Sequence, residues 1–198
     1  MNCPSCGADV SGGVGAVKMI ACPYCGTTSL LKGGQVFDAG STGEMHEAPA
    51  LIHLHQPVRI GDTVWTPLGQ ARFSYGRGEW DEFWCETPEG KGAWVSIDEG
   101  DVAVQRPMPP GWAKRIRKPP VLGEILHLDG KSYRITETED ARCIALRGSF
   151  PEPLSRGETY RFLNAEGPNG QLLSAESDGD DWVWFLGDWV DPFEVTAA

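Results

Sequence analysis

The chain has 198 residues, with 28 Asp and Glu against 17 Lys and Arg, so its formal net charge is −11. This excess of acid repels phosphate and disfavours proteins whose main ligand is DNA or RNA. Glycine and proline are abundant, at 25 and 15 residues, which favours short strands and turns over long helices. No apolar run is long enough to cross a bilayer, and we expect a cytoplasmic protein without a signal peptide.

Two C-x-x-C pairs open the chain, CPSC and CPYC, and fifteen residues separate them. A glycine, Gly7 or Gly26, follows each pair directly and allows the chain to fold back. This spacing is typical of a zinc ribbon, in which four thiolates hold one tetrahedral ion. The sequence therefore predicts a ribbon over residues 1–33 with a structural Zn²⁺ ligated by Cys3, Cys6, Cys22 and Cys25.

Three other interpretations of the four cysteines remain open: a redox C-x-x-C, an iron site of similar geometry, and disulfides. In a cytoplasmic protein the thiols stay reduced, which disfavours disulfides. Four thiolates also leave no open coordination position for water or substrate, so we do not expect a catalytic metal.

Two segments have the composition of linkers. The first covers residues 34–56 and is rich in Gly and polar residues; its His53 and His55 offer a weak second metal site. The second covers residues 106–120 and is basic and Pro-rich. Its charge permits docking to an acidic partner or to a membrane surface, without a transmembrane segment. The candidate binding residues there are Lys114, Arg115, Arg117 and Lys118.

The rest of the chain repeats a pattern of strands and turns. Gly61 aligns with Gly123 in a register without gaps, which places Val64 on Leu126 and Phe73 on Ile135, and a turn at Pro67 to Gly69 on Asp129-Gly130. We therefore expect a mainly β protein in which the ribbon is followed by two related small antiparallel β barrel or sandwich units, residues 57–105 and 121–198.

Several short motifs in this region resemble a bacterial family of unknown function, DUF4178. In the first half they are Gly61 to Val64, Trp80 to Trp84, Trp94-Val95 and Glu99-Gly100. In the second half they are Gly123-Glu124, Tyr133 to Ile135, Gly148 to Pro151, Glu176 and Leu186 to Val190. The resemblance implies a part in a bacterial stress or envelope-associated system, because such genes tend to lie near those for aminopropyltransferase-like and small membrane proteins. It implies no activity.

No complete catalytic set is recognisable in the sequence. Asp81 and Glu82 are adjacent, so on a strand they point to opposite faces and do not pair with each other. Cys143 or Cys85 with His127 would form a nucleophile pair, but neither cysteine lies in a nucleophile motif.

We expect a non-enzymatic zinc-ribbon interaction or adaptor protein with a protein partner. The alternatives are a nucleic-acid-binding ribbon protein and a small enzyme that uses Cys143 and His127.

Overall fold

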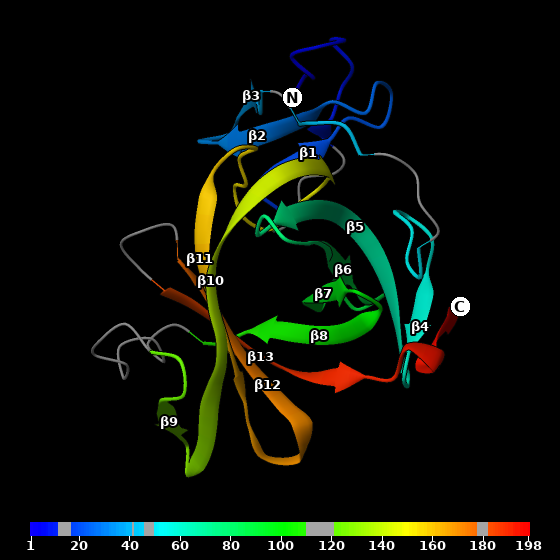
Figure 1. Cartoon of the computed structure of the whole chain (residues 1–198). Coiled ribbons are helices and arrows are strands. Elements are labelled where there is room, and N and C mark those ends of the chain that lie inside the picture. The colour runs from blue at the N-terminus through cyan, green and yellow to red at the C-terminus, as the bar shows by residue number, and fades with distance from the viewer. Residues whose placement is uncertain (12–16, 41, 46–49, 110–120, 178–181) are drawn as a thin grey trace.

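Short apolar and aromatic runs separated by Gly-containing turns produce a protein built from antiparallel strands (Figure 1). The computed structural model describes residues 1–11, 17–40, 42–45, 50–109, 121–177 and 182–198. Within them the only helical elements are short 3₁₀ turns, among them η3 (Pro168–Gly170) and η4 (Pro192–Glu194). The mainly β prediction is confirmed.

The N-terminal ribbon is a three-stranded antiparallel sheet. Its strands are β1 (Met19–Ala21), β2 (Thr28–Lys32) and β3 (Gln35–Asp38). Gly33 and Gly34 connect β2 to β3 with φ of 59° and 77°, the backbone that a two-residue hairpin of type I′ needs. The ribbon sheet thus extends to Asp38, beyond the expected boundary at residue 33, and the first part of the expected linker belongs to it.

The two predicted β units form the two halves of one closed barrel. Each half is a meander of four antiparallel strands. In the first half these are β5 (Thr63–Ser74), β6 (Glu79–Glu86), β7 (Gly92–Asp98) and β8 (Asp101–Pro107). In the second half they are β10 (Lys131–Gly148), β11 (Thr159–Glu166), β12 (Gln171–Ser177) and β13 (Trp182–Val190). The pairs β5–β10 and β8–β13 close the ring. The first strands of the two halves thus hydrogen-bond to each other, as do their last strands, and no edge of either meander is left unpaired.

The two halves are topologically related, but the gap-free register does not hold. Pro67 to Gly69 lie inside the continuous strand β5, at a bulge, and form no turn. The turn that matches Asp129-Gly130 is instead Gly61-Asp62, because each connects a short strand to the long first strand of its meander. Val64 and Leu126 consequently lie on non-equivalent strands.

A short hairpin strand covers the outer face of each half. In the first half this is β4 (Val58–Ile60), which is joined by the C-terminal strand β14 (Val195–Ala197); in the second it is β9 (Ile125–Leu128). Trp65 and Tyr133 occupy matching places, each two residues into the long strand of its half, and both are buried beneath these hairpins. The expected second unit is therefore not self-contained, since its last residues pair with the first half.

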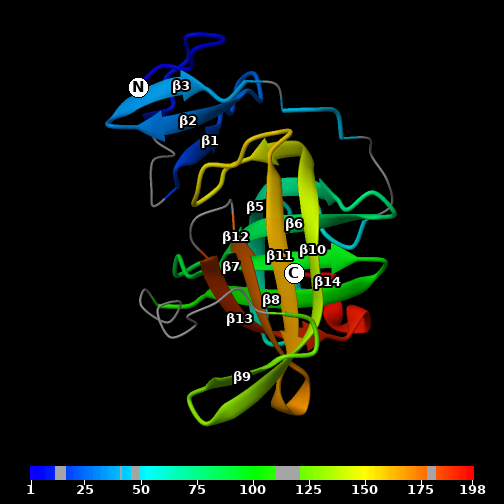
Figure 2. The same cartoon turned by 60° about the vertical axis from the view of Figure 1, so that its left-hand side comes forward.

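The ribbon lies over one end of the barrel (Figure 2). Met19 of β1 is 1% exposed and packs into the barrel's interior cluster beside Phe150, Trp94 and Leu154. Its amide and carbonyl each form a 3.1 Å hydrogen bond with Phe150, while the Leu154 amide lies 3.0 Å from its sulfur. One ribbon side chain therefore helps to close the barrel.

The Met19 contact predicts that the barrel depends on the ribbon. Met19→Ala should reduce the free energy of unfolding by about 2–5 kcal/mol, because it leaves a cavity where two parts of the fold meet. Urea denaturation followed by tryptophan fluorescence measures this loss. Lys32→Ala, an exposed change in the same ribbon, is the control and should be close to neutral. Equal stability of the two variants would contradict the coupling.

Candidate metal centre and barrel cavity

The two C-x-x-C pairs form equivalent turns. In the first, the Cys3 carbonyl accepts a 2.9 Å hydrogen bond from the Gly7 amide, and in the second the Cys22 carbonyl accepts one of the same length from Gly26. Both glycines have a positive φ, 76° and 73°, which a side chain would strain. Each turn thus points two sulfurs toward the other.

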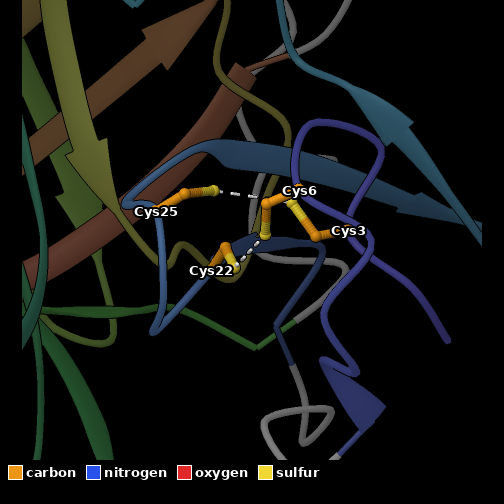
Figure 3. Close-up of side chains that lie close together, drawn as sticks. All are labelled: Cys3, Cys6, Cys22 and Cys25. Carbon is orange, nitrogen blue, oxygen red and sulfur yellow. Dashed lines mark hydrogen bonds between the residues drawn. The ribbon is translucent and has the colours of Figure 1, made fainter.

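The four sulfurs converge on one point (Figure 3). The Sγ atoms of Cys3 and Cys25 are 3.7 Å apart, those of Cys6 and Cys22 are 3.6 Å apart, and all four lie within 4.8 Å of one another. Disulfide sulfurs are about 2.05 Å apart, whereas thiolates about 2.3 Å from a shared tetrahedral ion are about 3.8 Å apart. The geometry fits a metal centre, and the predicted ligand residues are the ones brought together.

The neighbouring thiols differ in acidity. Hydrogen bonding with the Thr27 side chain, 3.3 Å from Cys25 Sγ, and with the Thr27 backbone lowers the pKa of Cys25 to about 6. Although the Ala8 backbone acts in the lowering direction, hydrogen bonds with the neighbouring cysteines and burial raise the pKa of Cys6 to about 12. A thiolate is the form that binds a metal.

The structure does not bring the predicted nucleophile pair together. Cys143 is fully buried inside the barrel, and burial raises the pKa of its thiol to about 12. His127 lies on β9, where its Nδ1 is 3.1 Å from the hydroxyl of Ser132. Ser132 and Cys143 are eleven residues apart on β10, which is roughly 35 Å along an extended strand. Cys85 is buried beneath the β4 hairpin, and burial raises its pKa as well.

The structure supports no binding site at the other predicted residues. Lys114, Arg115, Arg117 and Lys118 lie outside the described residues. Arg106, from the same basic segment, belongs to β8, and its guanidinium lies 5.5 Å from the centre of the Trp65 ring. Among the described residues only the four cysteines gather three or more metal-ligating atoms, so His53 and His55 form no second cluster there.

A cavity of about 160 Å³ lies inside the barrel, at the end away from the ribbon. Its position follows from the strands: Glu82 on β6 lines it, whereas Trp84 farther along the strand belongs to the cluster that contains Met19. Trp80 lines the cavity and also packs against that cluster. The turn between β7 and β8 and the exposed Thr136 mark its mouth. Side chains from both halves of the barrel form its wall.

A chain of hydrogen bonds crosses the cavity wall from one half to the other. Glu82 Oε1 accepts bonds from Trp80 Nε1 at 3.0 Å and from the Ser96 hydroxyl at 3.3 Å. Ser96 in turn accepts from the Gln105 amide at 3.2 Å, and the Ser174 hydroxyl donates to the Gln105 oxygen. The network therefore joins β6, β7 and β8 of the first half to β12 of the second.

Glu176 lies two residues beyond Ser174 on β12 and faces the same cavity. Burial raises the pKa of Glu82, and it raises that of Glu176 well above the usual range, with further contributions from the nearby carboxyls of Glu82 and Glu152. None of the described residues donates a hydrogen bond to Glu176, whereas Glu82 accepts two. Glu82 thus has hydrogen-bond donors, whereas Glu176 has none among the described residues. Carboxyl groups with a raised pKa in a cavity are typical of functional sites.

The pair of Glu82 and Glu176 was not predicted from the sequence. Asp81 and Glu82 point to opposite faces of β6, as predicted: Asp81 forms a bidentate ion pair with Arg72 outside the barrel, with both N···O distances at 2.8 Å, and Glu82 points inward. The partner of Glu82, however, comes from the other half of the chain. The one signal in the sequence was a carboxylate on the same strand face as Trp80 and Trp84, where an apolar residue is usual.

Comparison with known proteins identifies the barrel. A family model described as "Domain of unknown function (DUF4178)" matches residues 54–192. The chain belongs to this family. The match spans the barrel with its covering hairpins and leaves out the ribbon and β14. No curated protein and no solved structure matches the chain. In its described part, no helix has the length and apolar character to cross a membrane.

The state of Glu176 predicts how stability depends on pH. The folded protein holds the Glu176 proton more tightly than the unfolded chain does, since its pKa is raised. The stabilisation is complete below about pH 4 and is lost as the pH rises through the raised pKa. Glu176→Gln stays neutral, so it should match the parent in acid and raise the thermal midpoint by a few degrees at neutral pH.

Thermal unfolding at several pH values gives the midpoint as a function of pH for Glu176→Gln and for the parent, and the difference between the two is the measured effect. Glu86→Gln is the matched control, because Glu86 lies on β6, accepts a hydrogen bond from Trp84 Nε1 at 3.2 Å and does not line the cavity. A Glu176→Gln protein that is less stable than the parent at neutral pH would contradict the assignment.

Proposed function

We propose that the chain is a non-enzymatic binding protein that holds a small molecule inside its barrel. The observation that carries this proposal is the polar cavity formed by both halves of the barrel, which the half-buried Glu82 and Glu176 line. Eight-stranded barrels have an interior that is either filled by side chains or able to hold one small ligand. Here side chains fill the end beneath the ribbon, and the other end is left as a pocket with convergent polar groups.

The metal at the four cysteines is, in this proposal, a structural Zn²⁺. Support comes from the four-thiolate ligand set, the spacing and the tetrahedral sulfur geometry. Bound zinc would supply no reaction step, since the four thiolates complete its coordination. It would fix the ribbon and thereby hold Met19 in the end of the barrel. Free thiolates of this kind persist in a reducing compartment, which supports a cytoplasmic location.

The zinc assignment predicts one zinc per chain in the purified protein. Cys22→Ser should lose the metal, and removal of zinc by a chelator should lower the thermal midpoint of the whole protein, because zinc binding contributes to folding. Elemental analysis and thermal unfolding measure both effects. Cys85→Ser is the control, since Cys85 is buried outside the ribbon and should leave the zinc content unchanged. A folded ribbon without zinc, or with iron in its place, would contradict the assignment.

A second candidate function is the predicted adaptor role, with a protein partner bound at the ribbon. Two exposed aromatic side chains favour it: Tyr24, between the cysteines of the second pair, is 76% exposed, and Phe37 of β3 is 45% exposed. Exposed aromatic residues of this kind are enriched in protein interfaces. The nucleic-acid alternative depends on the basic segment outside the described residues, and the net charge of −11 weighs against it. A role in a bacterial stress or envelope-associated system is compatible with either function.

The binding function predicts that at least one class of small molecule stabilises the full chain. We would screen alcohols, carboxylates and amines of up to about eight non-hydrogen atoms by thermal shift, because a ligand of the folded state raises the midpoint. Ser96→Phe, which places a ring in the cavity, should abolish the rise in the thermal midpoint that the ligand causes. Ser132→Phe, an exposed change on β10, should keep it. If no class stabilises the protein, or if Ser96→Phe responds like the parent, the proposed function fails.

A further inference from the structure

The cavity has a strongly acidic lining. Six carboxyl groups contribute to its wall and mouth: Glu82, Asp98, Asp101, Glu137, Glu166 and Glu176. No Lys, Arg or His occurs among the described residues that line it. A concave surface lined by charge of one sign concentrates ions of the opposite sign. The electrostatics of the cavity thus select cations and reject anions.

Two of these carboxyls lack a hydrogen-bond donor among the described residues, the half-buried Glu176 and Asp98. None of those residues donates a hydrogen bond to Glu176, although it lies within the barrel. Asp98 Oδ1, nearer the mouth, is buried and has no hydrogen-bond partner either among the described residues. Buried acceptors without a donor are costly, and buried carboxylates require compensating charge. Both features point to a missing group that carries positive charge and N–H or O–H donors.

The missing group does not have the character of a metal ion. Among the described residues only the four cysteines bring three or more ligand atoms within 4.8 Å of one another, so the cavity carboxyls are not gathered around a single metal-sized point. Much of the remaining wall is aromatic, with Trp80 and Phe162 in contact at a centroid distance of 5.2 Å and Tyr75 beside Trp80. Aromatic faces attract organic cations and shield their apolar parts.

We propose that the cavity binds a small primary ammonium ion whose N–H groups donate to the Glu176 carboxylate, with Glu82 as a second negative charge and the Trp80–Phe162 wall against its hydrocarbon part. This inference rests on the proposed function and names the chemical class of its ligand. A cavity of about 160 Å³ is close in size to one of about 150 Å³ that binds benzene, so the ligand has about six non-hydrogen atoms. A quaternary ammonium does not fit, because it offers no N–H donor to Glu176.

The test is isothermal titration of the full, metal-loaded chain with probes of similar size. The amines are n-butylamine and n-pentylamine, and the matched probes are 1-pentanol (neutral), pentanoate (anionic) and tetramethylammonium (quaternary). We expect the amines to bind at least tenfold more tightly than each matched probe. Glu176→Gln should weaken amine binding at least tenfold while the protein stays folded, and Glu86→Gln, on the same barrel but outside the cavity, should leave it unchanged.

Each outcome separates this inference from the proposed function. Tighter binding of the amines that depends on Glu176 supports both. If pentanol, pentanoate or tetramethylammonium binds as tightly as the amines and Ser96→Phe removes that binding, the cavity is a ligand site and the ammonium assignment is overturned. Amine binding by Glu176→Gln that equals that of the parent overturns the ammonium assignment too. If neither amine binds, the ammonium assignment is overturned, and if no probe or screened compound binds, the proposed function is overturned as well.

Discussion

The pairing of β5 with β10 and of β8 with β13 is the constraint on which the other features of this protein depend. Each four-stranded half has two open edges, and open edges expose unpaired backbone groups. Joining equivalent edges removes all four at once and encloses an interior that neither half has alone. The polar network from Glu82 to Ser174 and the cavity at one end exist only because this closure brings β6 and β12 to face each other.

The interior of the barrel has a packed apolar end and an end that holds the acidic cavity. At the ribbon end, Met19, Phe150, Trp84 and Trp94 pack together in one buried cluster. At the other end, buried carboxyls lower the stability of the folded state at neutral pH, because their charged forms are poorly solvated. In the proposed binding function, a ligand with complementary charge would remove this cost when it binds. The packed end of the barrel and its contacts with the ribbon compensate for this cost.

Local features of this fold could be predicted from the sequence, and contacts between distant segments could not. The cysteine spacing identified the four residues that the structure brings together, and alternation with Gly-rich turns identified a mainly β chain with two related halves. The predicted gap-free alignment of the two halves was wrong because Pro67 to Gly69 resemble a turn in sequence, although they lie at a bulge within one long strand. The pairing of β5 with β10 and of β8 with β13 corresponds to no pattern within either stretch of sequence. Glu82 and Glu176 are 94 positions apart in the sequence, so the cavity that they share became visible only in the closed barrel.

The last strand of the chain has a consequence for how the protein is made. β14 pairs with β4, and β13 pairs with β8, so the first half receives two of its edge partners from residues 182–197. The first meander is therefore complete in sequence long before its edges are covered. During this interval the uncovered edges of β5 and β8 are open to pairing with strands of other molecules.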